Sequence, residues 1–388
     1  MSRYMRGFLW SFIFLFFFTC SVFSRDKDAF LIKGAKIYTL GKQGLLTNAA
    51  LFIEGGRIKK IIQDGVLPSV PVEDYSSKYI IPGLVDAHTY ISGYERLLEN
   101  TEIITSDLIT YPAFDPLHLE VKEALCSGIT TVNFVPRSEN LVGGISSIFK
   151  TTRGIGDLLF LKKEAFLKIS FNAEVARDDR APTSLMGAAK ILSQKMHTIA
   201  GENERKREGI FQDQGIRKLL KGRIQPLIAA STFEEINTAL QWFYKWNMKG
   251  VIVGGEEAHR LSNDLREKEI HVLLSPLLFS LPERMPKNAA SLLKNNVKVA
   301  FISNTPEGEP LGLRISALLL YHQGISQEEA LKTITLFPAQ ILGVVDSVGS
   351  IEEGKDADFV VFSGEPLDLS SRIEAVYSNG RAVFIDKK

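Results

Sequence analysis

Short apolar runs separated by longer amphipathic stretches make up the middle of the chain. Eight such runs have the length of a strand, and they cover residues 80–90, 128–135, 144–149, 166–171, 223–230, 250–253, 270–274 and 297–302. Strands buried on both faces of a parallel sheet read in this near-continuous apolar way. The intervening stretches carry helix-start signals. Thr232 and Glu235 are three residues apart, which is the spacing of a capping box. Ser326 and Glu329 have the same spacing, and the helix that they open is expected to continue to Leu336. Strands that alternate with helices predict a (β/α)8 TIM-type barrel over residues 81–348.

The two ends of the chain follow a different pattern, in which short strands are separated by turns. The pattern over residues 30–38 predicts one strand. The pattern over residues 50–62 predicts a hairpin that turns at Gly55 and Gly56. Residues 357–385 return to short strands after the last helical stretch. Both ends are therefore expected to be built from β-structure.

The first 24 residues have the pattern of a secretory signal segment. Arg3 and Arg6 precede an apolar run over residues 8–18, which is short for a membrane span. Cleavage after Ser24 is the favoured route of processing, and lipidation of Cys20 at a relaxed lipobox competes with it, while retention as an uncleaved anchor is the least favoured alternative. Either route predicts an exported protein, periplasmic or lipid-anchored to a bacterial membrane.

Composition excludes some partners. The 46 basic and 45 acidic residues nearly cancel, which gives no basic footprint for nucleic acid. The charged segment 202–223 mixes both signs and is typical of a solvated helix face. Cys126 is the one cysteine besides Cys20, so no internal disulfide is expected, and its place at an apolar helix end favours a small buried side chain over a nucleophile.

Two segments at opposite ends of the barrel region form recognisable motifs. The first is Pro82–Tyr90, which reads PGLVDAHTY, and the second is Val348–Val361, which reads VGSIEEGKDADFVV and continues through residues 364–381. Together they resemble the amidohydrolase superfamily, especially its imidazolonepropionase-like members. The resemblance implies hydrolysis of non-peptide carbon–nitrogen bonds with a zinc-type divalent metal. It also implies that residues 25–80 and 349–388 join into one small, discontinuous β-sandwich beside the barrel.

The metal-ligand set that this resemblance implies is largely replaced. It consists of His-x-His on the first strand, often a carboxylated lysine on the fourth, histidines on the fifth and sixth, and an aspartate on the eighth. His88 is kept, and Lys168 is the strand-four lysine, which leaves these two as the metal-ligand candidates. The remaining positions hold other residues, namely Tyr90, Ala229 or Ala230, Gly254 and Asn304. Asn304 stands at the position of the usual catalytic aspartate, but its amide cannot act as a general base.

Other residues could rebuild a site or line a pocket at the barrel mouth. His118 is the best second imidazole, while His197, His259, His271 and His322 are expected to be structural or exposed. Polar residues near the strand ends predict a small-molecule pocket, with these members: Tyr90, Asn133, Ser231, Glu256 and Ser275. Glu256 and Glu257 fit equally well as first-turn acids that favour a helix N-terminus.

Two hypotheses follow. The first is an exported amidohydrolase-superfamily protein with little or no metal-dependent catalysis, which binds a small molecule or a partner such as a second copy or an active relative. The alternative is an active metal-dependent amidohydrolase with a remodelled site that acts on a small amide or cyclic imide. Neither involves nucleic acid, and membrane contact is expected only through the signal segment or a lipidated Cys20.

Overall fold

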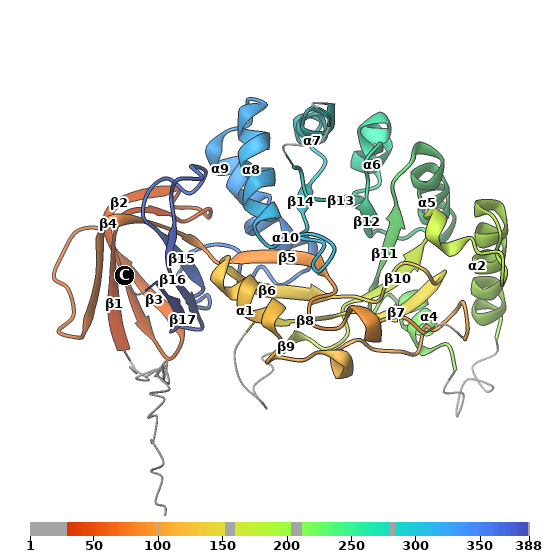
Figure 1. The fold of residues 1–388 in the computed structure, drawn as a ribbon, viewed down its shortest axis with the longest axis horizontal. Coiled ribbons are helices and arrows are strands. Elements are labelled where there is room, and N and C mark those ends of the chain that lie inside the picture. The colour runs from red at the N-terminus through yellow and green to blue at the C-terminus, as the bar shows by residue number, and fades with distance from the viewer. Residues whose placement is uncertain are drawn as a thin grey trace, which may run out of the picture.

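The computed structural model describes residues 29–99, 101–151, 160–202, 212–278, 282 and 284–386. The predicted signal segment, with Cys20 and Ser24, lies outside the described residues. The described part has two lobes, a β-lobe on the left of Figure 1 and a larger lobe of strands and helices on the right. Within the described residues, no helix is long and apolar enough to cross a membrane.

The β-lobe is one curved sheet that takes strands from both ends of the chain. Its order is β17-β16-β15-β4-β1-β2-β3. The strands are β1 (Ala29–Tyr38), β2 (Leu45–Glu54), β3 (Arg57–Ile62), β4 (Val72–Pro82), β15 (Phe359–Phe362), β16 (Ile373–Ser378) and β17 (Arg381–Ile385). The predicted hairpin is present as β2 and β3, and Gly55 and Gly56 turn it with positive φ of 57° and 75°. The sheet encloses its own core, which includes Ile32, Ile37 and Phe359.

The larger lobe contains two hydrogen-bonded sheets. One has the order β14-β13-β12-β11-β10-β7, and the other has the order β5-β6-β8-β9. The strands are β5 (Leu84–Thr89), β6 (Ile129–Phe134), β7 (Val142–Ile145), β8 (Ser147–Lys150), β9 (Phe160–Lys162), β10 (Phe166–Ser170), β11 (Gln225–Ala230), β12 (Val251–Gly254), β13 (His271–Leu274) and β14 (Val299–Phe301). Each predicted apolar run therefore contains a strand.

The sequence predicts a single ring of parallel strands. The described strands instead pair into two sheets, and β7 and β8 make antiparallel pairs. The third run breaks at Ser146 into β7, which pairs antiparallel with β10, and β8, which pairs antiparallel with β6. Gly144 has φ of 117° just before this break. The first run also divides, because Ile80 and Ile81 belong to β4 of the β-lobe, which ends at Pro82, and β5 starts after Gly83.

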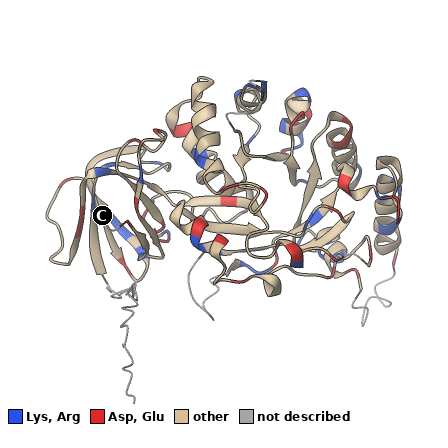
Figure 2. Cartoon of the chain, in the orientation of Figure 1, with Lys and Arg blue, Asp and Glu red and all other residues tan. Residues whose placement is uncertain are grey.

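Helices follow most of the strands of the larger lobe and cover its outer side (Figure 1). They are α1 (Leu119–Cys126), α2 (Leu185–Ala200), α4 (Gln214–Leu220), α5 (Phe233–Trp246), α6 (Ser262–Glu267), α7 (Arg284–Lys294), α8 (Gly312–His322), α9 (Gln327–Lys332) and α10 (Leu336–Ile341). The capping box predicted at Thr232 and Glu235 is confirmed at the start of α5. Basic and acidic residues are interspersed along the ribbon of both lobes (Figure 2).

The helix expected to run from Ser326 to Leu336 is instead divided, because α9 ends at Lys332 and α10 begins at Leu336. The hydroxyls of Thr333 and Thr335 donate to the carbonyls of Ala330 and Leu331, which offers the backbone an alternative to a continuous helix. The prediction of one helix was therefore wrong at these threonines.

A buried ion pair joins the two lobes. The ammonium of Lys150, at the end of β8, lies 2.9 Å from Asp356 Oδ2 and also donates to Asp358 Oδ2. The Lys150 side chain is 1% exposed and that of Asp358 is 3% exposed. The segment Gly354–Asp358, which reads GKDAD, therefore places two carboxylates against the larger lobe.

Candidate functional site

The centre of the predicted metal site holds a hydrogen bond between two side chains. His88 on β5 and Lys168 on β10 are both buried, and the distance between His88 Nε2 and Lys168 Nζ is 2.7 Å. Burial lowers the pKa of Lys168 to about 7. Burial, together with the charge of Lys168, holds the pKa of His88 well below its usual value. Both side chains can therefore be uncharged near neutral pH. The hydrogen bond engages Nζ of Lys168 and Nε2 of His88 with each other.

Tyr90 packs against this pair just beyond the end of β5. Its ring lies edge-on to His88 with 5.2 Å between ring centroids, and its other side meets Tyr94 at 5.7 Å. The phenol oxygen is 3.4 Å from Ser138 Oγ. Tyr90 is buried, and burial raises the pKa of its phenol, so the group stays neutral where a second imidazole would stand.

Asp86 is a buried acid that sequence analysis passed over within the Pro82–Tyr90 motif. Its carboxylate accepts from the backbone N–H of Ser303 at 3.1 Å and of His88 at 3.3 Å, and from the Ser303 hydroxyl. Burial raises its pKa to about 6. Asp86 thereby ties β5 to the segment after β14. A lone acid inside a continuous apolar strand was the signal that could have identified it.

Asn304 follows β14 in a left-handed backbone conformation, with φ of 56°. Its side-chain Nδ2 donates to Glu307 Oε2 at 3.3 Å. The other oxygen of Glu307 accepts from the Tyr94 hydroxyl at 2.5 Å, and this hydrogen bond raises the pKa of Tyr94 to about 12. The residue at the usual aspartate position is therefore engaged with a neighbouring carboxylate.

The other predicted ligand positions cannot take part in metal binding. Ala229 and Ala230 are buried and have no polar side chain. Gly254 has φ of 99°, and a Cβ added there would lie 2.3 Å from Ser231 Oγ. Across the ranges that the structure describes, no group of three or more His, Cys, Asp or Glu side chains could hold a metal ion. The residues present do not fit the zinc-type metal that the resemblance implies.

A pocket of about 240 Å³ opens beside the ends of β12, β13 and β14. Three predicted site residues line it, namely Glu256, Ser275 and Asn304. Sequence analysis missed Glu307 and the residues that α7 contributes, among them Met285 and Asn288. These come from loop and helix positions with no local sign of a site.

The remaining predicted pocket residues do not line this pocket. Tyr90 packs on His88, and Asn133 is fully buried with its Nδ2 donating to the Ala87 carbonyl at 3.0 Å. Ser231 leads into α5, where its backbone N–H donates to Glu235 Oε2 at 2.8 Å.

The other histidines are placed away from a common site. His118 is the N-cap of α1, and its Nδ1 accepts from the backbone N–H of Glu120 at 3.4 Å. His197 on α2 packs against Trp246 with 4.9 Å between ring centroids. His322 ends α8, and His259 lies in the short 3-10 helix Ala258–Leu261.

His271, at the start of β13, is expected to make the protein sensitive to acid. Burial, with Lys298 and Lys249 nearby, lowers its pKa to about 4. Because the unfolded chain then binds more protons than the folded one between pH 6.5 and 4, stability falls as the pH falls through this window. We expect His271→Gln to reduce the stability lost between pH 7 and pH 4.5 by about 2 kcal/mol, measured by guanidinium unfolding at both pH values. An unchanged loss would contradict this assignment.

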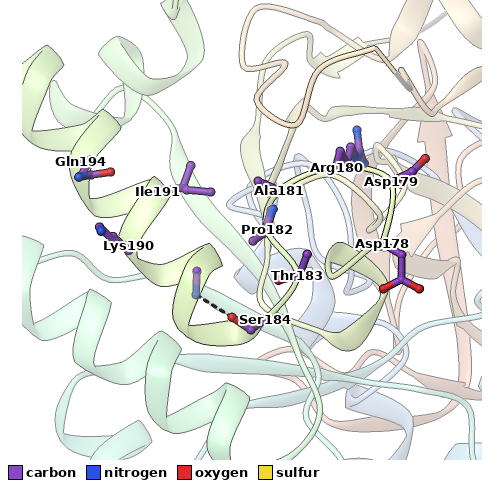
Figure 3. Close-up of a pocket in the computed structure, with 11 residues that line it drawn as sticks. Asp178, Asp179, Arg180, Ala181, Pro182, Thr183, Ser184, Lys190, Ile191 and Gln194 are labelled. Carbon is purple, nitrogen blue, oxygen red and sulfur yellow. Dashed lines mark hydrogen bonds between the residues drawn. The ribbon is translucent and has the colours of Figure 1, made fainter.

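A second hollow, of about 530 Å³, lies at the start of α2 (Figure 3). Its lining mixes both charges, with Asp178, Arg180 and Lys190 among its members. Ser184, the N-cap of α2, accepts from the backbone N–H of Gly187 at 3.2 Å. None of the predicted site residues lies here.

Comparisons with known proteins agree on one family. A profile described as "Amidohydrolase family" matches residues 296–384. An imidazolonepropionase from Brucella anthropi is 24% identical and covers 90% of this chain and 96% of its own length. An imidazolonepropionase from Thermoplasma acidophilum is 22% identical and covers 83% of this chain and 84% of its own length.

Solved structures give the same picture. The crystal structure of an amidohydrolase from Thermotoga maritima MSB8 is similar with a TM-score of 0.84 and 29% identity, and the match covers 92% of this chain and 100% of that one. A Xaa-Pro dipeptidase structure with bound methionine, at 14% identity and a TM-score of 0.59, shares the fold.

Proposed function

Because this chain belongs to the amidohydrolase superfamily, we propose that it is an exported member that binds a small molecule and has lost metal-dependent hydrolysis of carbon–nitrogen bonds. The observation that carries the proposal is the 2.7 Å hydrogen bond between His88 Nε2 and Lys168 Nζ. The ring nitrogen that would face a metal is engaged by an amine instead. The binding site would be the pocket lined by Glu256, Ser275 and Asn304.

The chemistry of the site supports loss of catalysis. Metal-bound water reaches a pKa near 7, whereas water without a metal keeps its value near 15.7. Asn304, at the position of the usual proton acceptor, has no titratable group. The alternative of an active hydrolase requires new ligands such as Glu256 or His118. His118 already caps α1, and Glu256 lines the pocket beside Asn304.

The fold that goes with this proposal is a (β/α)8 barrel interrupted at its third strand. The segment of β7 and β8 passes from one sheet to the other, and β14 lies next to β5. We also infer that residues 25–80 and 349–388 form a discontinuous β-sandwich, in which the single seven-stranded sheet folds over its own core. From the sequence we further propose that the protein is periplasmic or lipid-anchored at Cys20. We also propose that it assembles with a second copy or with an active relative.

Metal content tests this function directly. We expect protein lacking residues 1–24, dialysed against zinc and then against buffer, to contain close to no zinc per chain by elemental analysis. The double variant Tyr90→His/Asn304→Asp is expected to remain free of zinc, because Ala229, Ala230 and Gly254 supply no ligands. One or two zinc ions per chain in the unmodified protein would overturn the proposal and favour the active hydrolase.

A further inference from the structure

The pocket beside Asn304 has an acidic rim. Glu256, after β12, and Glu307, after β14, both line it, and none of its described lining residues is basic. Its other polar members are neutral, with Ser275 and Asn288 among them. Such a pocket favours a ligand with positive charge and disfavours an anion.

The interior of the same pocket is apolar. Leu274, Leu277 and Leu292 are buried at its walls, and Met285 on α7 adds a thioether side chain. The pocket volume of about 240 Å³ lies below the roughly 300–1,000 Å³ that is typical of pockets for drug-sized ligands. The space suits a compact ligand, smaller than the drug-sized molecules that fill larger pockets.

Glu307 is held in place and keeps room for another donor. The Tyr94 hydroxyl donates to one carboxylate oxygen at 2.5 Å, and Asn304 Nδ2 donates to the other at 3.3 Å. A carboxylate offers about four acceptor positions, so two donors leave acceptor capacity for a ligand. The carboxylate is therefore pre-positioned, which reduces the ordering that binding requires.

We propose that this pocket binds a small organic cation, an ammonium group carried on a compact apolar body. The ammonium would donate to Glu307 and Glu256, and the apolar body would lie against Leu274, Leu277 and Met285. This inference rests on the proposed function, in which the mouth of the barrel is a binding site without a metal. It goes further by naming the chemical class of the ligand.

Three probes of similar shape test the inference by isothermal titration calorimetry at pH 7 and low salt. They are cyclohexylammonium, cyclohexanol and cyclohexanecarboxylate. We expect cyclohexylammonium to bind at least tenfold more tightly than cyclohexanol, and cyclohexanecarboxylate to bind most weakly. Equal binding of the ammonium and the alcohol, tighter binding of the carboxylate, or no binding of the ammonium would overturn the cation proposal.

Variants locate the binding. We expect Glu307→Gln and Glu256→Gln each to weaken cyclohexylammonium binding by five- to tenfold and to leave cyclohexanol binding unchanged. Glu309→Gln is the matched control, because Glu309 is exposed near the pocket and does not line it. Ammonium binding that neither pocket variant weakens would place the cation elsewhere. Thermal unfolding of each variant checks that it folds.

The two proposals fail in different ways. Binding of cyclohexanol without preference for the ammonium leaves a metal-free binding pocket and removes only the cation. Stoichiometric zinc in the unmodified protein removes the proposed function whatever the probes do.

Discussion

Replacing Lys150 with methionine is expected to lower the free energy of unfolding by about 3–5 kcal/mol, the cost of leaving a buried charge without its partner. The Asp358 side chain is 3% exposed and that of Asp356 is 13% exposed, so Asp358 above all would be left as a buried charge, while Asp356 keeps Arg57 at 3.8 Å. Methionine keeps the length and apolar stem of the lysine and removes only the ammonium. Equilibrium unfolding in guanidinium measures the change.

Two further variants make this result specific to the buried charge. Lys332→Met removes an ion pair with Glu328 within one turn of α9, where both side chains are partly exposed, and should cost less than about 0.5 kcal/mol. Adding Asp358→Asn to Lys150→Met should restore part of the lost stability, because it removes the unpaired carboxylate. A cost below about 1 kcal/mol for Lys150→Met would show that the junction between the lobes does not depend on this pair.

Lys168→Met is expected to do the opposite and stabilise the protein at neutral pH. Burial lowers the Lys168 pKa from 10.5 to about 7, and the folded state bears a cost of about 4 kcal/mol for this shift at pH 7. Methionine removes that cost but leaves His88 Nε2 without a partner, which costs about 1–3 kcal/mol. The net gain should be about 1–3 kcal/mol in guanidinium unfolding.

The pH dependence of that gain identifies its cause. Between pH 7 and pH 10.5 the unfolded chain binds a proton at Lys168 that the folded chain has lost, so stability of the unmodified protein rises with pH through this window. The advantage of Lys168→Met should therefore shrink from pH 7 to pH 10. If the difference in free energy of unfolding between Lys168→Met and the unmodified protein stays constant with pH, or if the variant is less stable, the burial of the Lys168 amine does not destabilise the protein as expected.

The strands were predictable because their signal is local. A strand buried on both faces is apolar along most of its length, so the runs at residues 166–171 and 250–253 correspond to β10 and β12. The break at Ser146 was not predictable, because the same apolar run can pair as one strand or as two. Which happens depends on partners that are distant in the sequence.

The sequence predicted which metal ligands are missing from the centre of the site. It did not predict the hydrogen bond between His88 and Lys168 that takes the place of a metal. Tyr90 and Asn304 could be recognised as unlike a metal site from their side chains alone. The resemblance placed His88 and Lys168 at one site as metal-ligand candidates, but no pattern near either residue indicates that their nitrogens contact each other directly. Lys150 was passed over for the same reason, since a lysine that ends an apolar strand usually reaches solvent, and only the fold brings Asp358 to meet it.

The seven-stranded sheet also sets the order in which the protein can be completed. β15 pairs with β4 on one side and β16 on the other, so β4 gains its second neighbour only from residues that are made after the whole of the larger lobe. Until then the newly made chain carries β4 with an unpaired edge, and such edges pair readily with other chains. Aggregation through this edge of β4 is therefore the hazard that the architecture introduces, and it lasts until β15 pairs there.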